Sequence, residues 1–192
     1  MKLKEKYDIF DKNEKEEVRY ILGKTVDSKK KAVLCIGVNP SFANRSRKDL
    51  TMNILEKSIG NKYGCFIMMN LMPQRTSKVS NLDFEMDEKL SKDNLSNYKM
   101  ILEKYNVKDI ICALGNSIKL RGYLVNNLSK IFDVINEYDN KMNFYCFETT
   151  KSGNPVHPRW IQYQNKDTKE KVNLQYFDLK TYIEKLSYKS TK

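Results

Sequence analysis

The residues best suited to chemistry follow four apolar segments that we expect to form strands. Residues 37–42 (Gly-Val-Asn-Pro-Ser-Phe) follow the first segment, residues 70–75 (Asn-Leu-Met-Pro-Gln-Arg) the second, and residues 115–117 (Gly-Asn-Ser) the third. The fourth segment is followed by residues 149–160, which contain His157, the only histidine, and the only tryptophan. All four prolines of the chain lie in these loops. Because ligands of open α/β sheets bind at the carboxyl ends of strands, the loops predict one functional edge.

Asn39, Asn70 and His157 are the main candidates for chemistry in these loops. An amide offers both a donor and an acceptor, and an imidazole can donate or accept. Pro155 and Pro158 flank His157 and stiffen its loop. Each candidate also has a structural explanation, because Gly-X-Asn-Pro can be a tight turn, Asn70 can cap the next segment, and a single histidine is more often a packing residue. Their concentration at one edge favours a functional site.

The chain lacks the motifs of several other site types. Each cysteine lies in an apolar, strand-like run without a Cys-X-X-Cys pair, which predicts buried, reduced thiols and no metal site. There is no Gly-X-Ser-X-Gly motif, no Walker loop and no Rossmann glycine fingerprint. We therefore expect neither a serine hydrolase nor a metal or organic cofactor.

The hydrophobic pattern predicts alternating strands and helices. The expected strands are Lys31–Gly37, Gly64–Asn70, Lys108–Leu114 and Met142–Glu148. The expected helices are Lys12–Leu22, Asp49–Ile59, Met86–Tyr105, Asn116–Phe132 and Leu179–Leu186. Strands with nearly continuous apolar centres are typical of a buried parallel sheet. The order predicts a three-layer α/β/α fold with a mainly parallel, four-stranded central sheet. Alternation in Trp160–Gln164 and Val172–Phe177 predicts a hairpin before the last helix.

Length and composition predict a single domain with a nucleic-acid partner. The 192 residues divide into an N-terminal helical extension (1–30), a core (31–160) and a C-terminal hairpin and helix (161–192). The net charge of +11 favours a polyanionic partner, although AT-rich codon usage also explains many lysines. No run approaches ~18 apolar residues, and no apolar run follows the first residues. We therefore expect a cytoplasmic protein without a membrane partner, and no obligate protein partner is evident.

The order of the loop motifs resembles the uracil-DNA glycosylase superfamily. The motifs are Gly-X-Asn-Pro, an apolar strand ending in Asn, one ending in Leu-Gly, and His-Pro, over roughly Val33–Trp160. The chain resembles more closely an uncharacterised bacterial and phage family with Asn-Pro-Ser, Asp-X-Thr, Asn-Leu-X-Pro and Ser-Gly-X-Pro-X-His-Pro, which has no assigned activity. The superfamily implies a uracil-DNA glycosylase-like fold and a monofunctional DNA glycosylase, which hydrolyses the N-glycosidic bond of an altered base and leaves an abasic site.

The resemblance also implies catalytic roles. His157 corresponds to the histidine that donates a hydrogen bond to the departing base, and Asn39 to the residue that positions the attacking water. Because an asparagine cannot act as a general base, Asp49 of the Asp-X-Thr motif is a further catalytic candidate. Asp49 can equally be a helix N-cap or a first-turn acid that faces the helix dipole.

Substrate and DNA contacts complete the implied site. The substrate-binding set consists of Asn70, which reads the base edge, with Phe42, Gly37, Pro40 and Ser41. Phe42 is expected to stack on the base, with a core position as its alternative. The DNA-binding set consists of Arg75, Ser117, Lys151, Ser152, Arg159 and Trp160. Trp160 can fill the gap left by a flipped nucleotide or begin the core of the hairpin. Arg159 and Trp160 replace the small residues and hydrophobic wedge that usually follow His-Pro.

Several functional hypotheses remain open at this stage. The excised base can be uracil or a modified base, including one of phage DNA, and the DNA single- or double-stranded with the base flipped. The biological role can be DNA repair or antiviral defence. The alternatives are a catalytically inactive nucleic-acid-binding protein on the same scaffold and a nucleoside or nucleotide hydrolase.

Overall fold

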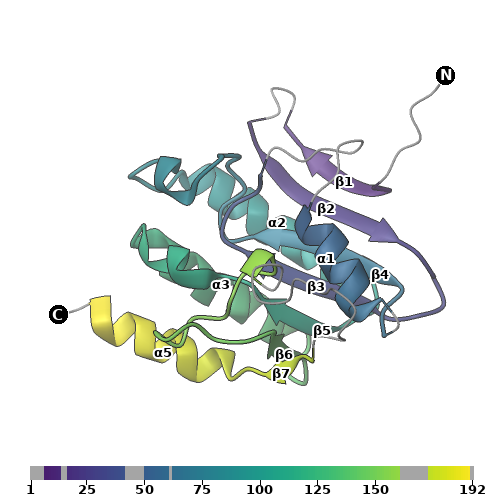
Figure 1. Ribbon diagram of the computed structural model, residues 1–192. Coiled ribbons are helices and arrows are strands. Elements are labelled where there is room, and N and C mark those ends of the chain that lie inside the picture. Colours follow the sequence, from purple (N-terminus) through teal and green to yellow (C-terminus); the bar gives the residue numbers. More distant parts are fainter. Residues whose placement is uncertain (1–6, 14–16, 42–49, 61, 161–172, 191–192) are drawn as a thin grey trace.

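The computed structural model describes residues 7–13, 17–41, 50–60, 62–160 and 173–190, and these form a three-layer α/β/α arrangement (Figure 1). Their sheet has seven strands in the order β1-β2-β4-β3-β5-β6-β7. The strands are β1 (Ile9–Lys12), β2 (Arg19–Thr25), β3 (Ala32–Gly37), β4 (Cys65–Asn70), β5 (Val107–Cys112), β6 (Asn143–Cys146) and β7 (Gln175–Tyr176).

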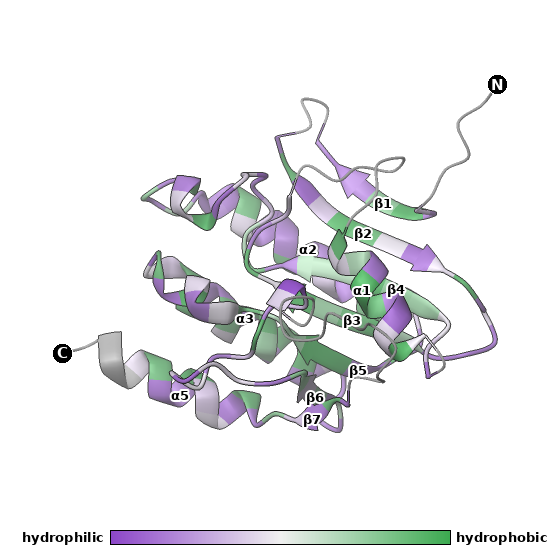
Figure 2. Cartoon of the chain, viewed as in Figure 1, coloured by the Kyte–Doolittle hydropathy of each residue, from purple (hydrophilic) through white to green (hydrophobic). Residues whose placement is uncertain are grey.

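The four expected strands are the parallel centre of this sheet. β3 pairs in parallel with β4 and β5, and β5 pairs in parallel with β6. The expectation of only four strands is wrong, because β2 and β1 extend one edge and β7 the other, all antiparallel to their neighbours. The central strands are almost entirely buried and hydrophobic (Figure 2).

Helices cover both faces of the sheet. α1 (Leu50–Ile59) packs on one face, where Met52 and Leu55 contact the cluster that contains Cys35 of β3. α2 (Glu88–Lys104), α3 (Tyr123–Tyr138) and α5 (Leu179–Ser190) cover the other face (Figure 1). On this face, Tyr98 and Leu102 of α2 lie in one hydrophobic cluster with the β3 residues that alternate with Cys35 along the strand. Side chains of a strand alternate between faces, so β3 contributes to both hydrophobic clusters.

Two short 3-10 helices complete the described elements, η1 (Val79–Asn81) and η2 (Gly115–Lys119). The helix expected over Asn116–Phe132 therefore begins as η2 and continues, after a break, as α3. The helix expected over Leu179–Leu186 is confirmed and extends to Ser190.

The expected N-terminal helix over Lys12–Leu22 is wrong, because this region contributes to β1 and β2. Val18, Ile21 and Leu22 are spaced as on one face of a helix, so periodicity alone could not separate the two structures. In the sheet, Ile21 packs into one hydrophobic cluster and Leu22 into the other. Leu22 is also in register with Met68 of β4. Pairing with β4 and burial on both faces favour the strand.

The expected hairpin is only partly within the described residues, because 161–172 lie outside them. Trp160 is in a helical turn with Arg159, not at the start of a strand. β7 pairs with β6, through Tyr145 and Tyr176, as the last strand of the sheet.

The cysteines confirm the expectation of buried thiols. All four are free and buried. Burial raises the pKa of Cys146 to about 11 and that of Cys112 well above its ordinary value, so both remain unreactive thiols. Within the described ranges, no cluster of His, Cys, Asp and Glu could hold a metal ion. In the same ranges, no helix combines the length and apolar character needed to cross a bilayer.

A buried carboxylate ties together the amino ends of the central strands. Asp109 of β5 is 1% exposed and accepts from Lys31 Nζ at 2.6 Å, Tyr63 OH at 2.7 Å and Asn143 Nδ2 at 3.0 Å. Burial raises the pKa of Asp109, but the three hydrogen bonds outweigh it and hold the pKa below its ordinary value. This cluster lies at the end of the sheet opposite the predicted functional edge.

Candidate functional site

A cavity of about 450 Å³ lies at the carboxyl ends of β3, β4 and β5. Helix α1 connects β3 to β4 across one face of the sheet, and α2 connects β4 to β5 across the other. Because β4 and β5 lie on opposite sides of β3, the strand order reverses at β3. Such a reversal opens a crevice where α/β proteins bind ligands. The described lining combines loop and 3-10-helix residues with the first residues of α1, one residue of β2 and two of β4: Arg19, Val38, Asn39, Ser41, Leu50, Thr51, Met68, Asn70, Thr76, Ser77, Lys78, Val79, Leu114, Gly115, Ser117, His157 and Arg159.

The three principal candidates from the sequence meet in this cavity. Asn39 follows β3, Asn70 ends β4, and His157 comes from the loop after β6. Ser41, Ser117 and Arg159, which the sequence also predicted, line the same space. Segments that are far apart in sequence thus contribute amide, imidazole and hydroxyl groups to the lining of one cavity.

Other predicted residues lie elsewhere. Gly37 and Pro40 are buried beside the cavity, and Arg75 is buried with its Nε 3.4 Å from the Ser41 carbonyl oxygen. Lys151 and Ser152 are exposed outside the described lining. Trp160 is half-buried against the cluster on the α1 face. Phe42 and Asp49 are outside the described residues.

Asn39 is held with its amide oxygen available to a ligand. Its Nδ2 donates to the Thr76 carbonyl oxygen at 3.1 Å and to Thr76 Oγ1 at 2.8 Å. Thr76 Oγ1 donates its own proton to the Lys78 carbonyl oxygen, so it must accept from Asn39. This chain of bonds fixes which end of the amide is the nitrogen. Among the residues that the structure describes, none donates to Asn39 Oδ1, which can therefore accept a hydrogen bond from a water or a ligand.

Asn70 carries a buried amide without a hydrogen-bond partner among the described groups. Its side chain is 1% exposed, and both Oδ1 and Nδ2 are unpaired. Its backbone is well held, because the carbonyl oxygen accepts from Asn94 Nδ2 at 2.8 Å and from Tyr98 OH at 3.3 Å. Asn127 Nδ2 donates a hydrogen bond to the carbonyl oxygen of the next residue, Leu71, at 3.2 Å. Polar side chains of α2 and α3 therefore hold the backbone at Asn70, while the donors and the acceptor of its side-chain amide have no partner among the described groups and can bind a ligand.

Gly37 leaves room for the Asn70 side chain. A Cβ at Gly37 would lie 2.7 Å from Asn70 Oδ1 and 2.7 Å from Met68 Cε. Both contacts are with side-chain ends, so an added methyl group displaces the amide more than the sheet.

We expect Gly37→Ala to lower ligand affinity at least tenfold while the protein still folds, because the methyl group moves Asn70 out of position. Equilibrium binding and circular dichroism measure the two effects. Gly122→Ala is the control, because a Cβ there would meet no described atom within 4 Å beyond its chain neighbours and its own helix. Unchanged binding by Gly37→Ala would contradict this role of Gly37.

His157 has a defined tautomer. Its Nδ1 accepts from the Arg159 backbone N at 3.2 Å, and its carbonyl oxygen accepts from the Trp160 backbone N at 2.9 Å. An imidazole that accepts at Nδ1 carries its proton on Nε2 when it is neutral. In its neutral form, His157 thus presents a donor and not an acceptor at Nε2.

A hydrogen-bond network holds the loop before His157. Asn154 is 1% exposed, donates from Nδ2 to Asn116 Oδ1 at 2.7 Å and accepts from Tyr182 OH at 2.8 Å. The Gly115 backbone N donates to the Pro155 carbonyl oxygen at 2.7 Å. Burial raises the pKa of Tyr182, so its hydroxyl stays a donor. The loop after β5 and helix α5 thus position the histidine loop.

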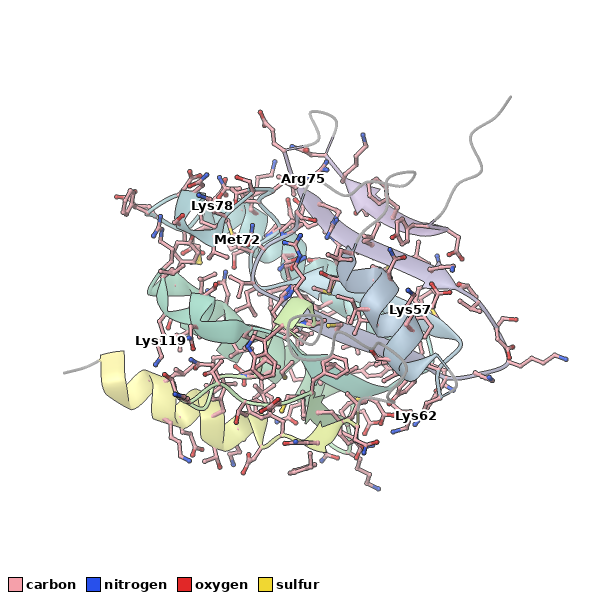
Figure 3. All side chains as sticks on the ribbon, in the orientation of Figure 1. Lys57, Lys62, Met72, Arg75, Lys78 and Lys119 are labelled. Carbon is pink, nitrogen blue, oxygen red and sulfur yellow. The ribbon has the colours of Figure 1, made fainter. Side chains whose placement is uncertain are left out.

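The described lining residues that sequence reasoning missed include an arginine of β2 and three successive loop residues. Arg19 was assigned to a helix, and Thr76, Ser77 and Lys78 directly follow the last loop residue that was considered. Figure 3 shows Arg75 and Lys78 on the loop after β4, and Lys119 at η2. Reading that loop to its end would have found the three loop residues.

The described lining is basic. Arg19, Lys78 and Arg159 contribute cations, and no Asp or Glu occurs among the lining residues that the structure describes. Arg19 is 2% exposed, whereas Lys78 and Arg159 are exposed at the rim. The cationic side chains of the described lining thus lie both at the rim and in the buried part of the cavity.

Comparison with known proteins identifies the family. The family described as "Protein of unknown function (DUF1643)" matches residues 19–159. A search of curated proteins found no match. The matched segment covers well over half of the chain, and its ends, Arg19 and Arg159, are also the first and last described residues of the cavity lining. The protein therefore belongs to the DUF1643 family.

Proposed function

We propose that the protein is a monofunctional DNA glycosylase that removes an altered base by hydrolysis and acts in the cytoplasm. The observation that carries the proposal is the meeting of Asn39, Asn70 and His157 in one cavity. The order of motifs that resembles the uracil-DNA glycosylase superfamily supports the same function. The volume of about 450 Å³ is in the range of small-ligand sites, so an extruded nucleotide can enter.

The three side chains match the needs of N-glycosidic hydrolysis. Cleavage develops positive charge on the sugar and negative charge on the departing base. His157 would donate from Nε2 to the base as this charge develops. Asn70 would pair with the base edge, and Asn39 Oδ1 would orient the attacking water. Ser41, Ser117 and Arg159 would contact the DNA backbone at the rim.

The test is an abasic-site assay. Duplex and single-stranded DNA containing uracil, unmodified DNA and phage DNA with modified bases are incubated with the protein and treated with alkali. We expect strand breaks with one substrate class, and a 100-fold or greater loss with His157→Ala, in line with removal of a charge-stabilising donor. Lys180→Ala, an exposed residue of α5 outside the described lining, is the control. No breaks on any substrate, with steeply salt-dependent DNA binding, would instead support an inactive nucleic-acid-binding protein.

Asn39→Asp tests whether the asparagine marks a lost carboxylate. A carboxylate at this position would face the Thr76 carbonyl oxygen, which now accepts from the amide at 3.1 Å. Two acceptors repel, so we expect Asn39→Asp to lower the rate at least tenfold instead of raising it. Single-turnover rates of both proteins measure this. A faster Asn39→Asp enzyme would show that a general base is missing from the natural chain.

A free-substrate assay separates the nucleotide-hydrolase alternative. Base release from dUMP and deoxyuridine is measured beside release from DNA. A rate on dUMP equal to or above that on DNA would replace the glycosylase proposal by nucleotide hydrolysis.

A further inference from the structure

We propose that the side-chain amide of Asn70 reads the edge of a base in either of its two orientations, so that the cavity accepts bases with an amino group as well as bases with a keto group. This inference rests on the proposed function in so far as the ligand is a base extruded from DNA. The substrate class then includes altered cytosines beside altered uracils. The argument starts from the surroundings of the amide, which fix where it lies but not which of its ends is the nitrogen.

The backbone holds Asn70 in place at the cavity. Its side chain is 1% exposed and lines the cavity. The residue ends β4 in register with Gly37 of β3, and its carbonyl oxygen accepts from Asn94 Nδ2 and Tyr98 OH. A ligand that enters the cavity therefore meets this amide at a defined point.

No printed contact orients the amide group itself. Among the described groups, neither Oδ1 nor Nδ2 of Asn70 has a hydrogen-bond partner. Asn70 Oδ1 and Met68 Cε each lie 2.7 Å from the point where a Cβ of Gly37 would stand, so a methyl group neighbours the amide oxygen. A methyl group neither donates nor accepts, and it therefore favours neither an oxygen nor a nitrogen at this position.

Asn39, in the same cavity, shows what an oriented amide requires. Its Nδ2 donates to the carbonyl oxygen and to Oγ1 of Thr76, and Thr76 Oγ1 donates in turn to the Lys78 carbonyl oxygen. Reversing the Asn39 amide would place its oxygen against two acceptors. The hydrogen bonds thus allow one orientation at Asn39, whereas those described at Asn70 allow two.

The second orientation of Asn70 also fits the space. A half-turn about the Cβ–Cγ bond exchanges Oδ1 and Nδ2, and this torsion of asparagine has broad preferences. The two ends of an amide differ little in size, and Gly37 has no side chain to obstruct either of them. The rotation therefore changes what the amide donates and accepts without changing the shape of the cavity wall.

The two orientations match the two kinds of pyrimidine edge. Uracil presents a carbonyl acceptor beside an N–H donor, and cytosine presents an amino donor beside a ring-nitrogen acceptor. An amide has one donor side and one acceptor side, so it pairs with either edge by turning over. An oriented amide would favour one edge by roughly 10- to 100-fold. Recognition of the altered base then depends on its substituent, which other parts of the cavity contact.

Equilibrium binding to the full chain tests the inference without bond cleavage. Deoxyuridine, deoxycytidine and 3-methyldeoxyuridine, whose N3-methyl group blocks the paired edge, are titrated by calorimetry. We expect deoxyuridine and deoxycytidine to bind within about threefold of each other, and both to bind at least about tenfold more tightly than 3-methyldeoxyuridine. A larger preference for either pyrimidine, equal binding of all three nucleosides, or no binding at millimolar concentration would each overturn the inference.

Variants of Asn70 identify the amide as the reader of both edges. Asn70→Leu should weaken deoxyuridine and deoxycytidine alike, to within about twofold of 3-methyldeoxyuridine. Asn70→Asp offers acceptors only, so it should weaken both by about fivefold or more, and it keeps the test decisive if Asn70→Leu fails to fold. Lys180→Ala, exposed on α5, is the control and should leave all affinities unchanged. Loss of only one of the two pyrimidines in either Asn70 variant would overturn the inference.

These outcomes are distinct from those of the abasic-site assay. Equal, Asn70-dependent binding of both pyrimidines without strand breaks on any DNA would leave the inference intact and refute the glycosylase. Strand breaks at uracil, together with a strong preference for deoxyuridine over deoxycytidine, would support the glycosylase and refute the inference.

Discussion

Replacing Asn70 with leucine is expected to make the protein more stable and to abolish its proposed activity. The Asn70 amide is buried with both polar atoms unpaired, and burying such a group without hydrogen bonds is unfavourable. An apolar side chain of similar size removes this penalty, which predicts a rise of about 1 kcal/mol in the free energy of unfolding. Chemical denaturation and the abasic-site assay measure the two effects on the same sample. Lower stability of Asn70→Leu would show that the amide is satisfied in the free protein.

Asn94→Leu is the matched comparison, because the Asn94 amide donates hydrogen bonds from Nδ2, while its Oδ1, like the Asn70 amide, has no partner among the described groups. Asn94 Nδ2 donates to the Asn70 carbonyl oxygen at 2.8 Å and lies 3.4 Å from that of Leu71. Its loss leaves a buried carbonyl oxygen with fewer donors, so we expect Asn94→Leu to lower stability by about 1–3 kcal/mol. A gain in stability in Asn70→Leu together with a loss in Asn94→Leu would identify Asn70 as a binding residue and Asn94 as a structural one. Binding sites commonly retain such locally unfavourable groups.

Asp109→Ala is expected to cause the largest loss of stability. The substitution leaves Lys31, Tyr63 and Asn143 without their shared acceptor. Breaking a buried pair costs about 3–5 kcal/mol, and the lower end applies because Lys31 is 36% exposed and can reach water. Denaturation in urea at pH 7 measures the loss. Asp139→Ala, which breaks the exposed pair with Lys108, is the control and should change stability only slightly.

The Asp109 contribution should also depend on pH. The folded-state pKa of Asp109 lies below its ordinary value of 3.8, so folding favours the charged carboxylate. The stabilisation is fully present above the ordinary pKa and is lost as the pH falls through the lower, folded-state pKa. The difference in free energy of unfolding between wild type and Asp109→Ala should therefore become smaller as the pH is lowered from about 5 to below the ordinary pKa of 3.8. A difference that stays constant with pH would refute the assignment.

The central architecture could be predicted because burial on both faces leaves a clear pattern. The four runs around Cys35, Met68, Ile111 and Phe144 are short and apolar at successive central positions, which is typical of strands covered on both faces. Their order then placed Asn39, Asn70 and His157 at the same ends of neighbouring strands. The topological rule needed no knowledge of side-chain geometry.

The edges of the sheet could not be predicted in the same way. Val18, Ile21 and Leu22 fit a helix as well as a strand, and the decision depends on pairing with β4, which is distant in sequence. Arg19 was missed for that reason, because its position at the cavity exists only once β2 joins the sheet. Asn94 and Asn127 could have been predicted from the sequence as buried hydrogen-bonding residues, because an asparagine on the apolar face of a helix requires a partner.

The hydrogen bond from the Tyr182 hydroxyl to the Asn154 side chain bears on which segment of the chain should be produced as a recombinant protein. The family match ends at residue 159, yet Tyr182 belongs to α5, and Leu179, Ile183 and Leu186 of the same helix are buried in the main core. A recombinant fragment cut at the ends of the match would expose that core and release the loop that carries His157. The segment by which family members are aligned is thus shorter than the unit that folds, and cloning boundaries should follow α5 instead of the alignment.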